Sequence, residues 1–174
     1  NQKGDELLPL EFEAVVQETE LSRSQTIEEM VTELEKGVEA YNRVKQIALK
    51  LTGPEDWVDM GGHPYLLESG AQKVAKAFGV QIGKVSLELQ WQEDSKGKYQ
   101  VALARGSAFS RKLGSYIEDI GACSQRDKLY AMRGVELIPI EEVDITMVMK
   151  KAIANLYGRL IKRVVGLMGV SWEN

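Results

Sequence analysis

The 174-residue sequence has very little of the two residue types that build most catalytic and metal sites: one cysteine, Cys123, and one histidine, His63. A single cysteine excludes an internal disulfide and any zinc site made from several cysteines, and a single histidine excludes the usual histidine-rich metal sites. A nucleophilic serine or cysteine would need His63 as its base, and His63 lies in a Gly-Gly-His-Pro turn far from Cys123 in the sequence. We therefore expect neither a cofactor nor a nucleophilic enzyme.

Long apolar runs and phosphate-binding glycine motifs are also absent. No run approaches the roughly 20 apolar residues that span a bilayer, and the N-terminus lacks a basic region followed by an apolar one. The patterns GxxxxGK[ST] and GxGxxG do not occur, which argues against an ATP-driven recombinase or helicase. We expect a cytoplasmic protein with no membrane partner.

Charge is unevenly distributed along the chain. Residues 1–40 contain three Lys/Arg and eleven Asp/Glu, a net charge of −8, whereas residues 41–174 contain 19 and 15, a net charge of +4. Residues 1–23 are acidic and show no sustained apolar period, so we predict an acidic N-terminal arm followed by a single domain over 24–174.

The first regular element predicted is a long amphipathic helix over residues 26–51. Thr26 and Glu29 have the spacing of a capping box, apolar residues recur every three or four positions, and Gly53-Pro54 ends the pattern. An apolar stripe of this length needs a partner surface, either the core of the domain or a neighbouring subunit.

The next segments predict an α+β fold. A short helix ending at Gly79 is followed by a period of two in a half-buried strand over 85–91, a turn at 94–97, a second strand from Tyr99 and a third over 115–123. After an ordered excursion over 126–144, Asp144 is placed to cap a final helix. The predicted fold is an antiparallel meander of about three strands with a long basic helix packed across it, preceded by the long amphipathic helix.

The final helix, predicted over 145–169, contains five basic residues and no acidic one. At about 100° per residue, its apolar face falls between about 140° and 220°, and three cations lie between about 0° and 80°. We expect no neighbouring carboxylate to neutralise this basic stripe, so a polyanion is its natural partner. The alternative is that the stripe is merely a solvated polar face of the helix. The apolar positions are Met149, Ile153, Leu156, Leu160, Val164 and Leu167, and the cations are Lys151, Arg159 and Lys162.

Other cations and aromatic rings come from the strands and their loops. With the basic stripe they could form a groove that neutralises phosphates, while the rings stack on bases. Core packing is the alternative role for the rings, and it is favoured for Tyr99. The cations are Arg105, Arg111, Lys112, Arg126, Lys128 and Arg133, and the rings are Tyr99, Phe109, Tyr116 and Tyr130.

Three glutamates provide the main alternative, a metal-dependent nuclease that uses Glu118, Glu141 and Glu142. Because adjacent residues of a strand face opposite sides, Glu118 and Asp119 cannot both line one site. The acids at 141–144 are also typical of a helix N-terminus.

Three motifs, HPYLLESGAQKVAKAFG, SYIEDIGACSQRD and KKAIANLYGRLIKRVVGLMG, resemble the DNA-annealing domain of the Rad-fifty-two family and its phage relatives over residues 56–169. The resemblance implies an antiparallel sheet crossed by a helix, subunits joined into rings or arcs, and single-stranded DNA in a groove. The basic cluster of the family's helix falls on Arg159, Lys162 and Arg163, and its helix-start lysine on Lys150 or Lys151. The excursion over 129–144 is longer than the family pattern.

These observations lead us to expect a non-enzymatic, ATP-independent protein that binds and anneals single-stranded DNA in recombination and repair, acting as a homo-oligomer. Candidate further partners are a single-strand-binding protein or a nuclease. The alternatives are the metal-dependent nuclease and an oligomeric structural or adaptor protein that assembles through helix 26–51. The residues expected to bind DNA are Lys150, Lys151, Arg159, Lys162, Arg163, Arg105, Arg111, Lys112, Arg126 and Lys128.

Overall fold

The computed structural model describes residues 26–134 and 136–171. The predicted acidic arm, residues 1–23, lies outside the described residues. The chain divides into a first and a second unit at the boundary between Tyr41 and Asn42. The division falls where the acidic part of the sequence gives way to the basic part.

Helix α2 runs over Ile27–Lys50 and begins with the predicted capping box. The Glu29 amide donates to Thr26 Oγ1 at 3.2 Å, and the Thr26 amide donates to the Glu29 carboxylate at 3.0 Å, so two amides that the helix leaves without partners are satisfied. The apolar stripe is exposed along its N-terminal part, where Ile27 is 80% and Leu34 66% exposed.

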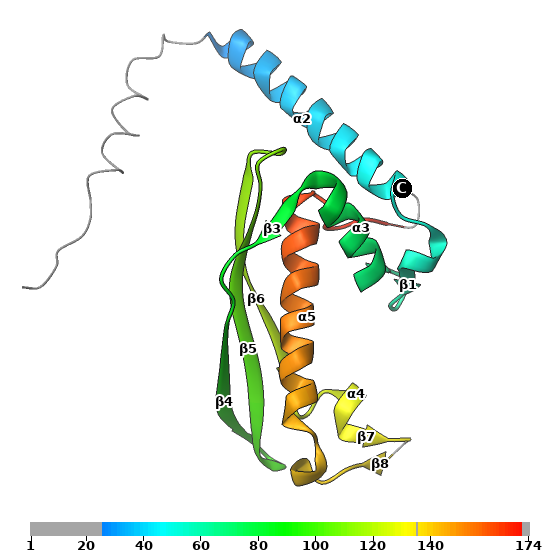
Figure 1. Ribbon diagram of the computed structural model, residues 1–174, viewed down its shortest axis with the longest axis vertical. Coiled ribbons are helices and arrows are strands. Elements are labelled where there is room, and N and C mark those ends of the chain that lie inside the picture. The colour runs from blue at the N-terminus through cyan, green and yellow to red at the C-terminus, as the bar shows by residue number, and fades with distance from the viewer. Residues whose placement is uncertain (1–25, 135, 172–174) are drawn as a thin grey trace, which may run out of the picture. The chain divides into compact units, whose positions relative to one another are not determined.

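The second unit has the predicted α+β class, with helices and an antiparallel sheet in separate layers (Figure 1). None of the described helices is long and apolar enough to cross a membrane. After the end of α2, the elements are η1 Pro54–Asp56, β1 Trp57–Asp59, β2 Pro64–Leu66, α3 Glu68–Phe78, β3 Val80–Ile82, β4 Ser86–Asp94, β5 Gly97–Ser110, β6 Ser115–Ser124, α4 Lys128–Ala131, β7 Met132–Arg133, β8 Glu136–Leu137, η2 Ile140–Glu142 and α5 Ile145–Val164.

The main sheet is built around β5, which pairs with β4 and β3 on one side and with β6 on the other, all antiparallel. This confirms the predicted meander. Strand β5 is longer than the apolar alternation of Tyr99, Val101 and Leu103 indicated, because it continues past the end of its pairing with β4 to pair with β3. Two small hairpins, β1–β2 and β7–β8, stand apart from the main sheet.

The prediction of a half-buried strand over 85–91 is correct only for its first part. Leu87 is partly buried, but Leu89 is exposed and Trp91 is 67% exposed. Among the described elements, none buries these two side chains near the β4–β5 turn. The apolar alternation identified the strand without showing how far the covering layer extends.

Helix α5 covers one face of the sheet (Figure 1) and begins with the predicted cap, because the Thr146 amide donates to Asp144 Oδ1 at 2.8 Å. It ends at Val164, five residues earlier than predicted. Gly166 has a positive φ of 72°, and the Leu167 amide turns back to donate to the Lys162 carbonyl at 2.7 Å. This arrangement satisfies the last carbonyls of the helix and stops it.

The buried face of α5 is wider than the predicted apolar face. Leu156, Leu160 and Val164 are buried as expected, but Val148 and Ala152 are buried too. By the angular count used above, these two flank Arg159 at about 60° and 100°. The side of the helix that carries Arg159 therefore lies next to the sheet, although the Arg159 side chain itself stays 46% exposed.

Helix α5 approaches the sheet very closely at Gly121 of β6. A Cβ at this position would lie 2.3 Å from both the Ala152 carbonyl oxygen and the Leu156 amide nitrogen. Only a residue without a side chain lets the helix backbone come this close. The glycine of the SYIEDIG motif therefore sets the distance between helix and sheet.

Candidate nucleic-acid interface

The ten residues expected to bind DNA do not line one groove. Those of α5 lie in the helix layer. Arg105 lies on β5, where it pairs in register with Ser86 and Ile120. Its neighbour Ala104 is buried in the core, so the Arg105 side chain faces away from α5. Two more lie in the turn between β5 and β6, and the last two follow β6 near the β4–β5 turn. The prediction of a single basic groove made by all of them is wrong, because strand alternation and the length of the sheet separate them. The two turn residues are Arg111 and Lys112, and the last two are Arg126 and Lys128.

Asp119 of β6 neutralises part of the basic stripe of α5. Its carboxylate accepts from Arg159 Nε at 3.0 Å and Nη2 at 3.1 Å, and Arg163 Nε lies 3.2 Å away. The Asp119 side chain is only 8% exposed. The expectation that no carboxylate neutralises the stripe is therefore wrong, because Asp119 is 40 residues away in sequence but faces the same side of the helix.

The electrostatics of this pair follow from its partial burial. Burial disfavours the charged form of Asp119, but hydrogen bonds from Arg159 and the Ile120 amide, with the charges of Arg159 and Arg163, outweigh it and lower the pKa of the carboxyl. The hydrogen bond to Asp119 raises the pKa of Arg159 in turn. Both groups stay ionised at neutral pH, and the pair fixes α5 to the edge strand.

Lys162, the other cation of the predicted cluster, is partly buried over an aromatic ring. Its Nζ lies 4.5 Å from the centre of the Tyr65 ring. Burial, with the nearby charge of Arg159, lowers the pKa of Lys162. Lys162 therefore contributes to packing between α5 and the β2 segment as well as to surface charge.

Three of the strand and loop cations already make polar contacts within the fold. Arg126 donates to Asp94 at 2.9 Å and to the Gly97 carbonyl at 3.1 Å, and its guanidinium lies 5.1 Å from the centre of the partly buried Tyr99 ring. Lys112 donates to the Ala77 carbonyl at the end of α3, and Arg133 pairs with Glu142. Tyr116 is exposed and donates to Glu118, whereas Phe109 and Tyr130 are partly buried.

A smaller set of the predicted cations remains available to a ligand. Within the described ranges, these side chains make no hydrogen bond or ion pair, and all except the partly buried Lys151 are exposed. Lys151 is the member of the basic stripe that is free to bind phosphate, and Lys150 precedes it on α5. The set is Lys150, Lys151, Arg105, Arg111 and Lys128.

Lys151 lines a cleft of about 260 Å³ between α3 and α5, here called the α3–α5 cleft. Two tyrosine rings and several small residues line it, and Gly158 leaves open space where a side chain would stand. Sequence reasoning missed this site, although small residues at helical spacing on α5 were a signal. The lining residues are Tyr65, Leu66, Leu67, Glu68, Ala71, Gln72, Lys151, Ala154, Asn155, Tyr157, Gly158 and Ile161.

A second, wider depression of about 540 Å³ lies over β5 and β6. Arg105 and Lys84 supply its positive charge, and Glu118 supplies negative charge. It is an open surface groove rather than a closed pocket. Its lining residues are Lys84, Ser86, Arg105, Gly106, Ser107, Glu118, Asp119 and Ile120.

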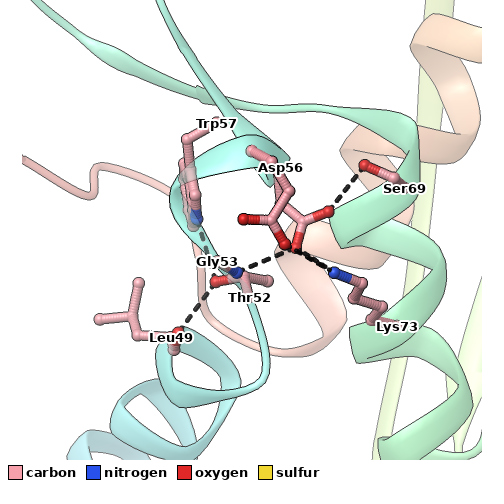
Figure 2. Close-up of polar contacts among 8 residues, drawn as sticks. Leu49, Thr52, Gly53, Asp56, Trp57, Ser69 and Lys73 are labelled. Atoms are coloured by element: carbon pink, nitrogen blue, oxygen red, sulfur yellow. Dashed lines mark hydrogen bonds and ion pairs between the residues drawn. The ribbon is translucent and has the colours of Figure 1, made fainter.

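The wall of the α3–α5 cleft is positioned by the buried carboxylate of Asp56, shown in Figure 2. It accepts from Lys73 Nζ at 2.6 Å, Ser69 Oγ at 2.7 Å and the Gly53 amide at 3.0 Å. The hydrogen bond from Lys73, followed by those from Gly53 and Ser69, lowers the pKa of Asp56 to about 2 despite burial. Asp56 thus ties η1 to α3. Sequence reasoning did not anticipate this contact.

The three glutamates of the nuclease alternative are not brought together. Glu118 neighbours Asp119, which contacts Arg159, whereas Glu141 and Glu142 precede the first turn of α5. The first turn of α5 and Arg159 are about 14 residues apart, which corresponds to roughly 20 Å along the helix at about 1.5 Å per residue. Within residues 26–134 and 136–171, no group of three acidic, histidine or cysteine side chains could hold a metal ion.

Comparison with models of protein families and with curated protein sequences gives no match for this chain. The resemblance to the Rad-fifty-two family therefore stays a prediction from the three motifs.

Proposed function

We propose that this chain binds single-stranded DNA along the outer side of α5 and anneals complementary strands without ATP, as a homo-oligomer. The observation that carries the proposal is the pair of unpartnered lysines on α5, Lys150 and Lys151, of which Lys151 lines a cleft together with two tyrosine rings. Lysines neutralise phosphates and rings stack on bases of any sequence, which is the combination that binds single strands.

The net charge of the second unit supports a polyanionic ligand. Residues 41–174 carry +4 although the whole chain carries −4. Two of the cations on α5, Arg159 and Arg163, share the single carboxylate of Asp119, so this corner keeps a net positive charge. A surface of this kind attracts DNA phosphates and gives binding that weakens with salt.

Annealing by such a surface needs no fuel. Neutralising the phosphates of one strand lowers the repulsion toward a second strand, and base pairing then supplies the driving force. Assembly of several copies would hold a longer strand, and the exposed apolar stripe of α2 supports self-association. The same stripe favours the second candidate, an oligomeric structural or adaptor protein, which would bind no DNA.

The decisive experiment measures fluorescence anisotropy of a labelled oligothymidylate at several salt concentrations. Each lysine on a single-strand phosphate contributes about −0.7 to the slope of log affinity against log salt. Lys150→Ala with Lys151→Ala should weaken binding and flatten the slope by roughly 1.4. The matched control, Lys84→Ala with Arg105→Ala, removes two exposed charges from the opposite face and should leave the slope unchanged.

If the control pair changes the slope and the α5 pair does not, the interface lies on the open face of the sheet and the proposal for α5 fails. Binding by neither parent nor variants would favour the adaptor. Annealing is measured separately, with two labelled complementary strands in EDTA and without ATP. Degradation of the labelled strand on adding Mg²⁺ would support the nuclease instead.

A further inference from the structure

We propose that the α3–α5 cleft receives one nucleobase of the bound strand, an inference that rests on the function proposed above. Its volume, about 260 Å³, suits one planar ring rather than an extended ligand. Leu66, Ala71 and Ile161 line it with apolar atoms, and Tyr65 and Tyr157 contribute rings. Sites of this type bury an apolar ring and orient it with a few polar groups.

The charges around the cleft distinguish a base from a phosphate as its occupant. Glu68 lines the cleft, so its carboxylate repels a phosphate that enters. Gln72 Nε2 donates to Glu68 at 3.1 Å, which leaves the amide oxygen of Gln72 and further carboxylate lone pairs for the amino or imino groups of a base edge. Lys151 also lines the cleft and can neutralise the phosphate that follows an inserted base.

The walls of the cleft are built before any ligand binds. The Asp56 carboxylate fixes α3 through Ser69 and Lys73, and the ring of Tyr65 is held under Lys162. A preformed site binds with little loss of conformational entropy. The main free-energy cost of binding is therefore that of unstacking the base from a flexible single strand.

The test combines a cleft-filling variant with an oligonucleotide that lacks bases. Gly158→Leu places a side chain in the cleft, and a Cβ at this position meets no atom within 4 Å. The control, Thr146→Leu, adds the same side chain at an exposed position in the first turn of α5. Anisotropy is measured with a labelled oligothymidylate and with an abasic strand of equal length.

One stacked base is worth about 1–3 kcal/mol, or about fivefold to 150-fold in affinity. We expect Gly158→Leu to weaken binding of the intact strand by a factor in this range, without changing the salt slope or the affinity for the abasic strand. Thr146→Leu should bind both strands like the parent. Tyr157→Ala, which removes a ring that is 40% exposed, should reproduce the selective loss and provides a second variant if Gly158→Leu does not fold.

Three outcomes would overturn the inference. Equal losses on intact and abasic strands would mean that the cleft contacts only the backbone. Unchanged binding of both strands by Gly158→Leu and Tyr157→Ala would leave the DNA-binding function standing but place no base in the cleft. Altered oligomer size without altered DNA binding would identify the occupant as a side chain of another copy. Failure of the parent to bind the intact strand would instead refute the proposed function.

Discussion

Replacing glycine with alanine should have opposite effects on stability at two positions, Gly121 in the contact between α5 and β6 and Gly158 in the α3–α5 cleft. In Gly121→Ala, the new Cβ would lie 2.3 Å from two backbone atoms of α5, whereas ordinary carbon contacts are about 3.5–4.0 Å. The helix must therefore move outward by about 1 Å or more. In Gly158→Ala, the new Cβ meets nothing within 4 Å.

The magnitudes follow from these two environments. Overpacking of a tight core costs about 1–3 kcal/mol, so Gly121→Ala should lower the free energy of unfolding by about that amount. Alanine is better than glycine inside a helix by about 0.8–1 kcal/mol, so Gly158→Ala should raise it. For a chain of this length, 1 kcal/mol corresponds to about 2–4 °C in Tm. We expect a fall of about 2–12 °C for the first variant and a rise of about 2–4 °C for the second.

Thermal unfolding followed by circular dichroism at 222 nm measures both shifts under one set of conditions. A Tm for Gly121→Ala at or above that of the parent would show that α5 does not rest on the backbone of β6. The conclusion that this glycine sets the distance between helix and sheet would then be wrong. A fall in Tm for Gly158→Ala would show that the α3–α5 cleft is more tightly packed than described.

Three further predictions concern charge and assembly. Asp119→Asn should lower the free energy of unfolding by about 1.5–3 kcal/mol. Because it frees Arg159 and Arg163 to bind phosphate, it should also steepen the salt slope of DNA binding. An unchanged Tm in thermal unfolding would mean that the ion pair does not stabilise the contact between α5 and β6. Because the pKa of Asp56 falls from 3.8 to about 2 on folding, its carboxylate stabilises the fold above about pH 4 and this contribution is lost as the pH falls toward 2. In Asp56→Asn, the Tm measured against pH should be lower above pH 4 and should lose that part of its acid dependence; identical pH profiles for parent and variant would refute the role of the Lys73 contact. Light scattering should show a mass above that of the 19.4 kDa monomer at micromolar protein, through the exposed stripe of α2, and a monomer with and without DNA would exclude self-association.

The features that the sequence predicted correctly depend on interactions over a few residues. The capping box at Thr26 and the cap at Asp144 each join residues two or three positions apart, and the αL glycine at Gly79 ends α3 as expected. The alternation of β6 is equally local, and it correctly placed Glu118 and Asp119 on opposite faces. Local spacing alone can predict such elements because the backbone geometry repeats every 3.6 or 2 residues.

The residues that define the candidate interface depend instead on which faces meet in the tertiary structure. Arg159 looks like a free surface cation in its own helix, but Asp119 lies opposite it on β6, so the charge is shared with a carboxylate 40 residues away. The position of α3, which forms one wall of the α3–α5 cleft, likewise depends on a contact between Asp56 and Lys73, 17 residues further along the chain. Helical periodicity gives the angle of a side chain about its own axis, but the strand or helix that faces it is decided by packing, here by the close approach of α5 to Gly121.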